Sequence, residues 1–78
     1  MPQIRHPKYL KAFGRNLQKL RLERNMSQRE LSYRIDVSFT QIGRIERGEI
    51  NAGISTLYEI AQALQVEMKD LFDFDPKK

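Results

Sequence analysis

Apolar residues recur every three or four positions along most of this chain, which is the period of a helix with one buried face. Residues 7–23 carry such a stripe, made of Leu10, Phe13, Leu17 and Leu20. Residues 54–64 carry a second one, made of Leu57, Ile60, Ala61 and Leu64. A short third run, residues 67–72, presents Met68, Leu71 and Phe72. No segment alternates convincingly as a strand does, so the pattern predicts three helices here.

Two capping signals predict two further helices between these segments. Ser27 is followed three residues later by Glu30, and Ser38 is followed three residues later by Gln41. In such a capping box the serine oxygen accepts from the amide three residues on, and the longer side chain reaches back to the serine amide. We expect one helix to run from the first box through Arg34.

The second box opens a helix that runs through Arg47, with Gly48 as its stop. The two serines are 11 residues apart, so only a short joint separates the two helices. Two short capped helices on either side of a tight joint form a helix-turn-helix. The sequence therefore predicts an all-α fold, a compact bundle of five short helices.

The length of 78 residues allows one domain. We expect a flexible basic arm at residues 1–8, the helix-turn-helix domain at 9–73 and a C-terminal tail at 74–78. The chain has no cysteine and one histidine, so we expect no disulfide, no metal site and no cofactor. We find neither a membrane-spanning run nor a signal peptide, and we expect a cytoplasmic protein.

Charge is divided unevenly along the chain. Residues 1–47 hold 11 Lys and Arg against 4 Asp and Glu, a net charge of +7. Residues 48–78 hold 3 against 6, a net charge of −3. A basic N-terminal part suits a polyanion such as nucleic acid, although ordinary solvated helix faces would give the same counts.

Residues 13–72 resemble the lambda-repressor-like DNA-binding domain, also described as the Xre or Cro/cI-type helix-turn-helix. The matching strings are Leu20-Arg21, Met26-Ser27-Gln28-Arg29-Glu30-Leu31, Ile42-Gly43-Arg44-Ile45-Glu46-Arg47-Gly48 and Thr56-Leu57-Tyr58-Glu59-Ile60-Ala61-Gln62-Ala63-Leu64. Two residues depart from the family, which usually has glycine where this chain has Asp36 and Gln65. By resemblance we expect a left-handed backbone at both. Aspartate tolerates this conformation better than most residues, and at Gln65 it costs about 1–2 kcal/mol.

The resemblance makes residues 38–47 the recognition helix and implies that Phe39, Thr40 and Arg44 contact base edges in the major groove. Thr40 and Arg44 are one turn apart and share a face of that helix. Arg44 has the geometry to pair with guanine O6 and N7. Alternatives remain for each residue: ion pairing for Arg44, a second cap for Thr40 and core packing for Phe39.

Phosphate contacts are implied for a wider set of polar residues. Gln28 matches the family's glutamine at the start of the second helix, where the helix dipole also favours an anion. The other candidates for backbone contact are Gln41, Arg15, Arg29, Arg47 and Asn51. Plain solvation is the alternative for each of them. The arm at residues 3–8 is either a groove-tracking segment or a solvated tail.

Arg21 and Glu46 have a structural role by resemblance, as an ion pair between the first helix and the end of the recognition helix. Removing one partner of a part-buried pair costs about 3–5 kcal/mol. We therefore expect neither residue to contact bases.

Family members commonly pair on a palindrome, so we expect a homodimer on a palindromic operator. Leu71, Phe72 and Phe74 are the expected interface, because so short an end has little room to bury them. Packing against the chain's own core is the alternative.

The expected function is sequence-specific binding of double-stranded DNA by a transcriptional regulator, most simply a repressor. Activation is an equal alternative, because it depends on where the operator lies. We expect no small-molecule ligand, because the chain has no sensor domain. The alternative is a protein-interaction module, or an antitoxin, that keeps the fold while DNA binding is secondary or absent. We do not expect an enzyme, because the chain lacks a cysteine nucleophile, a histidine paired with a base and a phosphate-binding loop.

Overall fold

The structure, a computed structural model, describes residues 4–76 and consists of five helices. They are α1 (Pro7–Glu23), α2 (Gln28–Arg34), α3 (Phe39–Glu46), α4 (Ile54–Leu64) and α5 (Met68–Leu71). Within residues 4–76 no strand is present. The predicted all-α bundle of five short helices is therefore confirmed. Residues 1–3 of the expected arm and residues 77–78 of the expected tail lie outside the described part of the chain.

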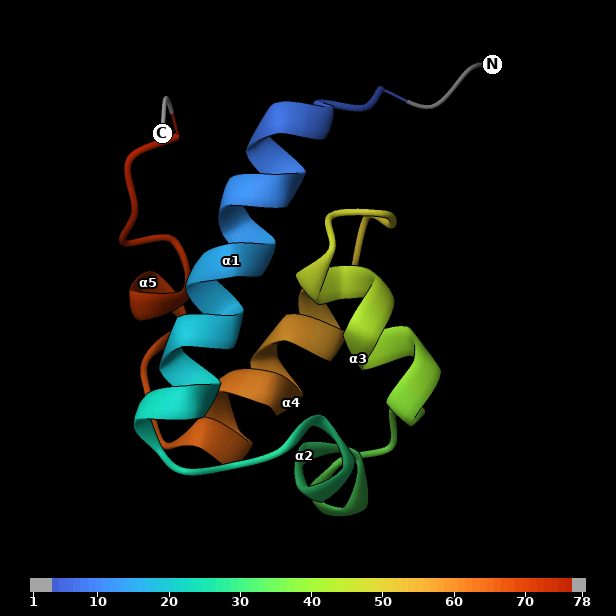
Figure 1. Cartoon of the computed structure of the whole chain (residues 1–78), viewed down its shortest axis with the longest axis vertical. Coiled ribbons are helices and arrows are strands. Elements are labelled where there is room, and N and C mark those ends of the chain that lie inside the picture. Colours follow the sequence, from blue (N-terminus) through green and yellow to red (C-terminus); the bar gives the residue numbers. More distant parts are fainter. Residues whose placement is uncertain (1–3, 77–78) are drawn as a thin grey trace.

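Helix α1 is the longest element (Figure 1). Helices α3 and α5 pack against it, and α2 packs against α3 and α4. Pro7 occupies its first turn, where a missing N–H costs nothing. It ends where Asn25 turns left-handed at φ 53°, and the amide of Met26 returns to the carbonyl of Arg21. Both helix bounds agree with the sequence prediction, although Pro7 itself had been assigned to the arm.

The caps of α2 and α3 differ. Ser27 forms the full capping box: its oxygen accepts from the amide of Glu30 at 3.0 Å, and its own amide donates to the Glu30 carboxylate at 3.2 Å. Ser38 accepts from the amide of Gln41 at 3.1 Å. The Gln41 side chain is exposed and makes no return bond, so the second box is only half formed and this expectation was wrong.

Left-handed backbone occurs at one of the two expected positions. Gln65 caps α4 with φ 59° and ψ 42°, as predicted. Asp36 does not have a positive φ. Among the non-glycine residues of the described chain, a positive φ occurs at Asn25 and Gln65. The joint turns instead through Ile35, whose φ of −136° and ψ of 164° are extended. An extended residue needs no glycine nearby, which removes the expected strain.

The core draws on every helix. Its fully buried side chains are Leu17, Leu31, Ile42, Ile60, Leu64 and Leu71. Each contributes about 1.5–3 kcal/mol relative to an exposed position. The inward residues predicted for α4 are all buried.

Glycines let α3 approach α1 at two points. A Cβ atom on Gly14 would lie 2.6 Å from the carbonyl oxygen of Ile45 and closer still to that of Glu46. Gly48, with φ 73°, has its α-carbon against the backbone of Lys11. The C-terminal end of α3 is thus fixed against α1, whereas its N-terminal end lies at the edge of the molecule (Figure 1).

The segment after α5 returns along α1 towards its N-terminal end (Figure 1). The ring of Phe74 lies 5.1 Å from that of Tyr9 and 6.3 Å from that of Phe13, and Phe72 lies 5.1 Å from Phe13. Leu71 is fully buried in the single chain, so this member of the expected interface belongs to the core. Phe72 remains 42% exposed.

Candidate nucleic-acid interface

The outer face of α3 carries the three residues expected to contact bases. Phe39, Thr40 and Arg44 are all exposed, while Ile42 and Ile45 on the opposite face are 0% and 2% exposed. The burial of the inner face fixes the rotation of α3 about its axis. The side chains therefore project outward from a rigid helix.

Phe39 is 43% exposed, so it does not take the core position left open by the sequence. The guanidinium of Arg29 on α2 lies over its ring, 4.7 Å from the centroid. A cation over an aromatic face at that distance gains about 0.5–1 kcal/mol when exposed. The pair thus joins a flat apolar surface to a positive charge at the N-terminal end of α3.

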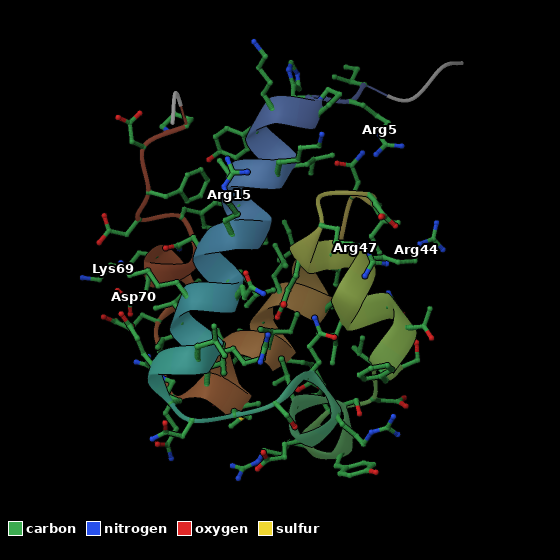
Figure 2. All side chains as sticks on the ribbon, viewed as in Figure 1. Arg5, Arg15, Arg44, Arg47, Lys69 and Asp70 are labelled. Carbon is green, nitrogen blue, oxygen red and sulfur yellow. The ribbon has the colours of Figure 1, made fainter. Side chains whose placement is uncertain are left out.

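A second cluster of charge lies at the other end of α3. The carboxylate of Glu49 accepts from Arg47 Nε at 2.8 Å and lies 3.7 Å from Arg44 Nε. Arg5, from the segment before α1, donates to the Glu49 carbonyl oxygen at 2.9 Å. Figure 2 shows these arginines gathered on one side of the molecule, near the loop that follows α3.

The contact between Arg47 and Glu49 changes both titrations in the expected direction. The hydrogen bond from Arg47 holds the pKa of the Glu49 carboxyl below its usual value. The same bond raises the pKa of Arg47. Both groups are exposed and fully charged at neutral pH, so the cluster combines cations with one fixed anion.

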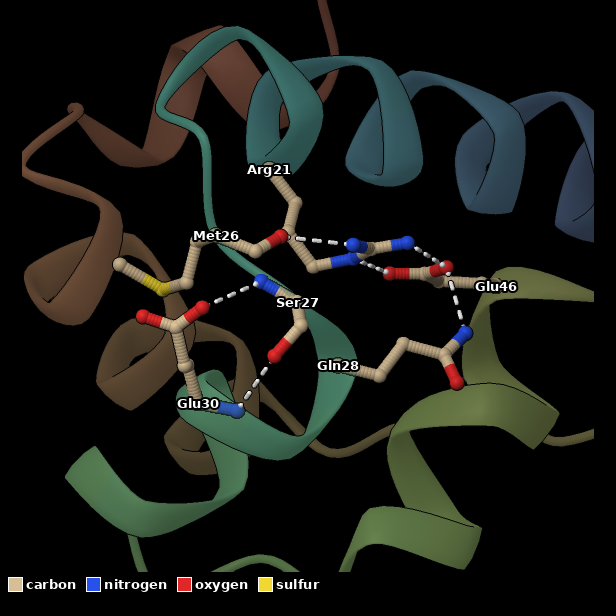
Figure 3. A network of polar contacts seen from close by, with 6 residues as sticks. All are labelled: Arg21, Met26, Ser27, Gln28, Glu30 and Glu46. Atoms are coloured by element: carbon tan, nitrogen blue, oxygen red, sulfur yellow. Dashed lines mark hydrogen bonds and ion pairs between the residues drawn. The ribbon is translucent and has the colours of Figure 1, made fainter.

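Behind the exposed face, a buried carboxylate joins three helices (Figure 3). Glu46 accepts from Arg21 Nε at 2.7 Å and Nη2 at 3.0 Å, and from Gln28 Nε2 at 2.8 Å. Arg21 also donates to the Met26 carbonyl at 2.7 Å. The side chains of Arg21 and Glu46 are only 6% and 3% exposed. Their expected pairing is present, and each guanidinium nitrogen of Arg21 donates to an acceptor.

The side-chain amide of Gln28 keeps one N–H hydrogen after its bond to Glu46. Gln28 is part-buried at the N-terminus of α2, next to Gly43 of α3. An anion arriving there would meet that hydrogen together with the first-turn amides of α2 that the Ser27 cap does not occupy. Gln28 thus donates one hydrogen bond to the buried carboxylate and keeps a second N–H that can donate to an anion.

The structure divides the remaining backbone-contact candidates. Arg29, Gln41, Arg47 and Asn51 are exposed on α2, α3 and the loop after α3. Arg15 lies elsewhere: Figure 2 shows it over α1 beside the C-terminal segment, apart from Arg44 and Arg47.

Sequence reasoning missed two features of this surface. Glu49 was not considered, because its contact with Arg47 depends on the left-handed turn at Gly48. Ile54 and Tyr58 of α4 are 77% and 53% exposed, although only the inward face of this helix had been considered. Their spacing of four residues, apolar on the outer face, was the available signal.

Between residues 4 and 76, no group of three or more His, Asp or Glu side chains could hold a metal ion. None of the described helices combines the length and the apolarity that crossing a bilayer requires.

A helical domain that exposes one face of a short helix beside several arginines defines a protein of the class that binds double-stranded DNA. The helix-turn-helix family matches residues 17–71, which is more than half of the chain. The chain belongs to this family of DNA-binding transcriptional regulators.

Similar proteins share both sequence and shape. The control protein C.BamHI of Bacillus amyloliquefaciens is 41% identical over 63 residues, 80% of this chain and 78% of that protein. The uncharacterized HTH-type transcriptional regulator y4dJ of Sinorhizobium fredii is 39% identical over 78% of this chain and 79% of its own length. The crystal structure of the restriction-modification controller protein C.AhdI from Aeromonas hydrophila superposes with a TM-score of 0.79. It is 32% identical, over 81% of this chain and 96% of that one.

Proposed function

We propose that this protein represses transcription by binding a specific duplex site with α3 in the major groove. The observation that carries the proposal is the exposure of Phe39, Thr40 and Arg44 on a helix whose other face is buried. The similarity to C.BamHI and C.AhdI, named as a control protein and a restriction-modification controller protein, favours a regulator whose target is a promoter.

Each exposed residue of α3 has a distinct role in this proposal. Arg44 donates two hydrogen bonds to guanine, a contact that discriminates by about 1–3 kcal/mol. Thr40 contacts the neighbouring base edge or its phosphate. Phe39 packs against thymine methyl groups, which are the apolar feature of the major groove.

Polar residues around α3 hold the DNA backbone. Gln28 and the first turn of α2 bind one phosphate, and Arg29, Gln41, Arg47 and Asn51 bind others along both sides of the helix. Such contacts set the orientation of the protein without carrying sequence information. Arg15 of α1 is a further candidate for a backbone contact.

We further propose a homodimer on a palindromic operator, working in the cytoplasm, where the DNA lies. One domain reaches only a few base pairs, and two copies would address half-sites about 34 Å apart. The exposed part of Phe72 and the adjoining Phe74 are the proposed interface.

Selection of bound duplexes from a random pool tests this function. We expect one recovered motif with two-fold symmetry, and an affinity that falls steeply as salt rises. Absence of any mobility shift at low salt would contradict DNA binding and favour a protein-interaction or antitoxin role. A motif without symmetry would contradict the dimer alone.

A further inference from the structure

We propose that Glu49 is an internal competitor of DNA phosphate: its carboxylate occupies Arg47 and Arg44 in the free protein and so limits sequence-independent binding to duplex DNA. The inference rests on the proposed function, because it concerns arginines of the same surface. It assigns a role to an acidic residue at the edge of a basic site.

The geometry places one anion between two cations. Arg47 donates to Glu49 through Nε at 2.8 Å and Nη2 at 3.4 Å, and Arg44 Nε lies 3.7 Å away. The side chains of Arg47, Arg44 and Glu49 are 59%, 52% and 46% exposed. An incoming phosphate oxygen can therefore reach the same N–H groups that the carboxylate now occupies.

The position of Glu49 is set by its backbone rather than by chance in a loose loop. Its amide donates to the Arg44 carbonyl at 2.9 Å, after Gly48 has turned the chain back on α3. Its own carbonyl accepts from Arg5 at 2.9 Å. Two contacts on the main chain thus hold the carboxylate beside the end of α3.

The energetics suit a reversible competitor. An exposed ion pair contributes about 0.2–1 kcal/mol, which a phosphate backbone with many charges outweighs. The carboxylate is anionic at neutral pH, because the hydrogen bond from Arg47 lowers its pKa. This competition lowers the affinity most for complexes held by phosphate contacts alone, because they have no base contacts that would offset the loss.

The test is the affinity of the full chain for a random-sequence duplex, measured by fluorescence anisotropy across a range of salt. Glu49→Gln keeps the shape of the side chain and all backbone contacts while removing the charge. Glu23→Gln is the matched control, because it removes the same charge from an exposed carboxylate at the end of α1. Thermal unfolding checks that both variants fold as the wild type does.

We expect Glu49→Gln to tighten binding about two- to five-fold, the factor that one exposed ion pair represents. The slope of log affinity against log salt should steepen by about one, since one more cation is free to release a counterion. Glu23→Gln should match the wild type. Equal behaviour of the two variants would overturn the role of Glu49 and leave the proposed function intact. Failure of the wild type to bind any duplex would instead overturn the proposed function and the inference with it.

Discussion

At the scale of single residues, Arg44 is the side chain on which sequence preference should depend most. Its guanidinium is half exposed and held only by a 3.7 Å contact with Glu49, so it is free to reorient towards a base. We expect Arg44→Ala to relax preference at one position in each half-site and to cost about 1–3 kcal/mol there. Selection from a random pool measures this directly.

The control for this substitution is Arg34→Ala, which removes an exposed arginine from the C-terminal turn of α2. It should leave the recovered motif unchanged. If Arg44→Ala weakened every duplex equally, Arg44 would be a phosphate contact and not a base reader.

Phe39 gives a second prediction at this scale. Its exposed ring should contact thymine methyl groups, so replacing thymine by uracil in the operator should weaken binding by the wild type. Phe39→Ala should weaken binding to the thymine duplex and show no further loss with uracil. Isothermal titration of the four pairs completes a double-mutant cycle. Independent losses would mean that the ring and the methyl group do not touch.

At the scale of helices, the approach of α3 to α1 depends on Gly14. An added Cβ would collide with backbone carbonyls of Ile45 and Glu46, which cannot move without shifting α3. We expect Gly14→Ala to lower the free energy of unfolding by about 1–3 kcal/mol, as for other overpacked sites. Urea denaturation measures this change.

The matched control is Gly53→Ala, because no atom lies within 4 Å of that added Cβ and the backbone there, with φ −73°, suits alanine. Gly53 is the N-cap of α4, where alanine is less favourable than glycine, so this variant should lose about 0.5 kcal/mol without any steric collision. Equal losses in the two variants would show that glycine content, and not the contact between helices, decides stability.

The helices show why some features were predictable and others were not. The bounds of α1 and α4 follow from periodicity and from stops such as Asn25, which are local properties of the chain. The left-handed Gln65 also follows a helix end directly. The left-handed backbone predicted at Asp36 is absent, because the joint turns instead through an extended backbone at Ile35, which the sequence does not reveal. The role of Glu49 was missed because its contacts with Arg47 and Arg44 arise only after the left-handed turn at Gly48 directs the chain back towards α3.

At the scale of the whole molecule, the proposed dimer depends on the surface around Phe72. Phe72 is 42% exposed, yet its ring also contacts Phe13. We expect Phe72→Asp to shift the protein towards monomer in sedimentation velocity, because a carboxylate at an apolar interface loses its hydration.

Tyr33→Asp is the control for this shift, since Tyr33 is 76% exposed on α2. It should sediment as the wild type does. An unchanged profile for Phe72→Asp, with the fold intact by circular dichroism, would place the interface elsewhere. The exposed Ile54 and Tyr58 on α4 are then the next surface to vary.

The carboxylate of Glu46 has a consequence for the choice of operator. Glu46 bonds Gln28 at the start of α2 and Arg21 of α1 at once. The distance between the phosphate proposed to bind at Gln28 and the side chains of α3 proposed to contact bases is therefore fixed by the fold. A duplex whose groove does not match that spacing must itself bend or twist to fit. Flexible steps at positions that no side chain touches should therefore rank among the preferred bases.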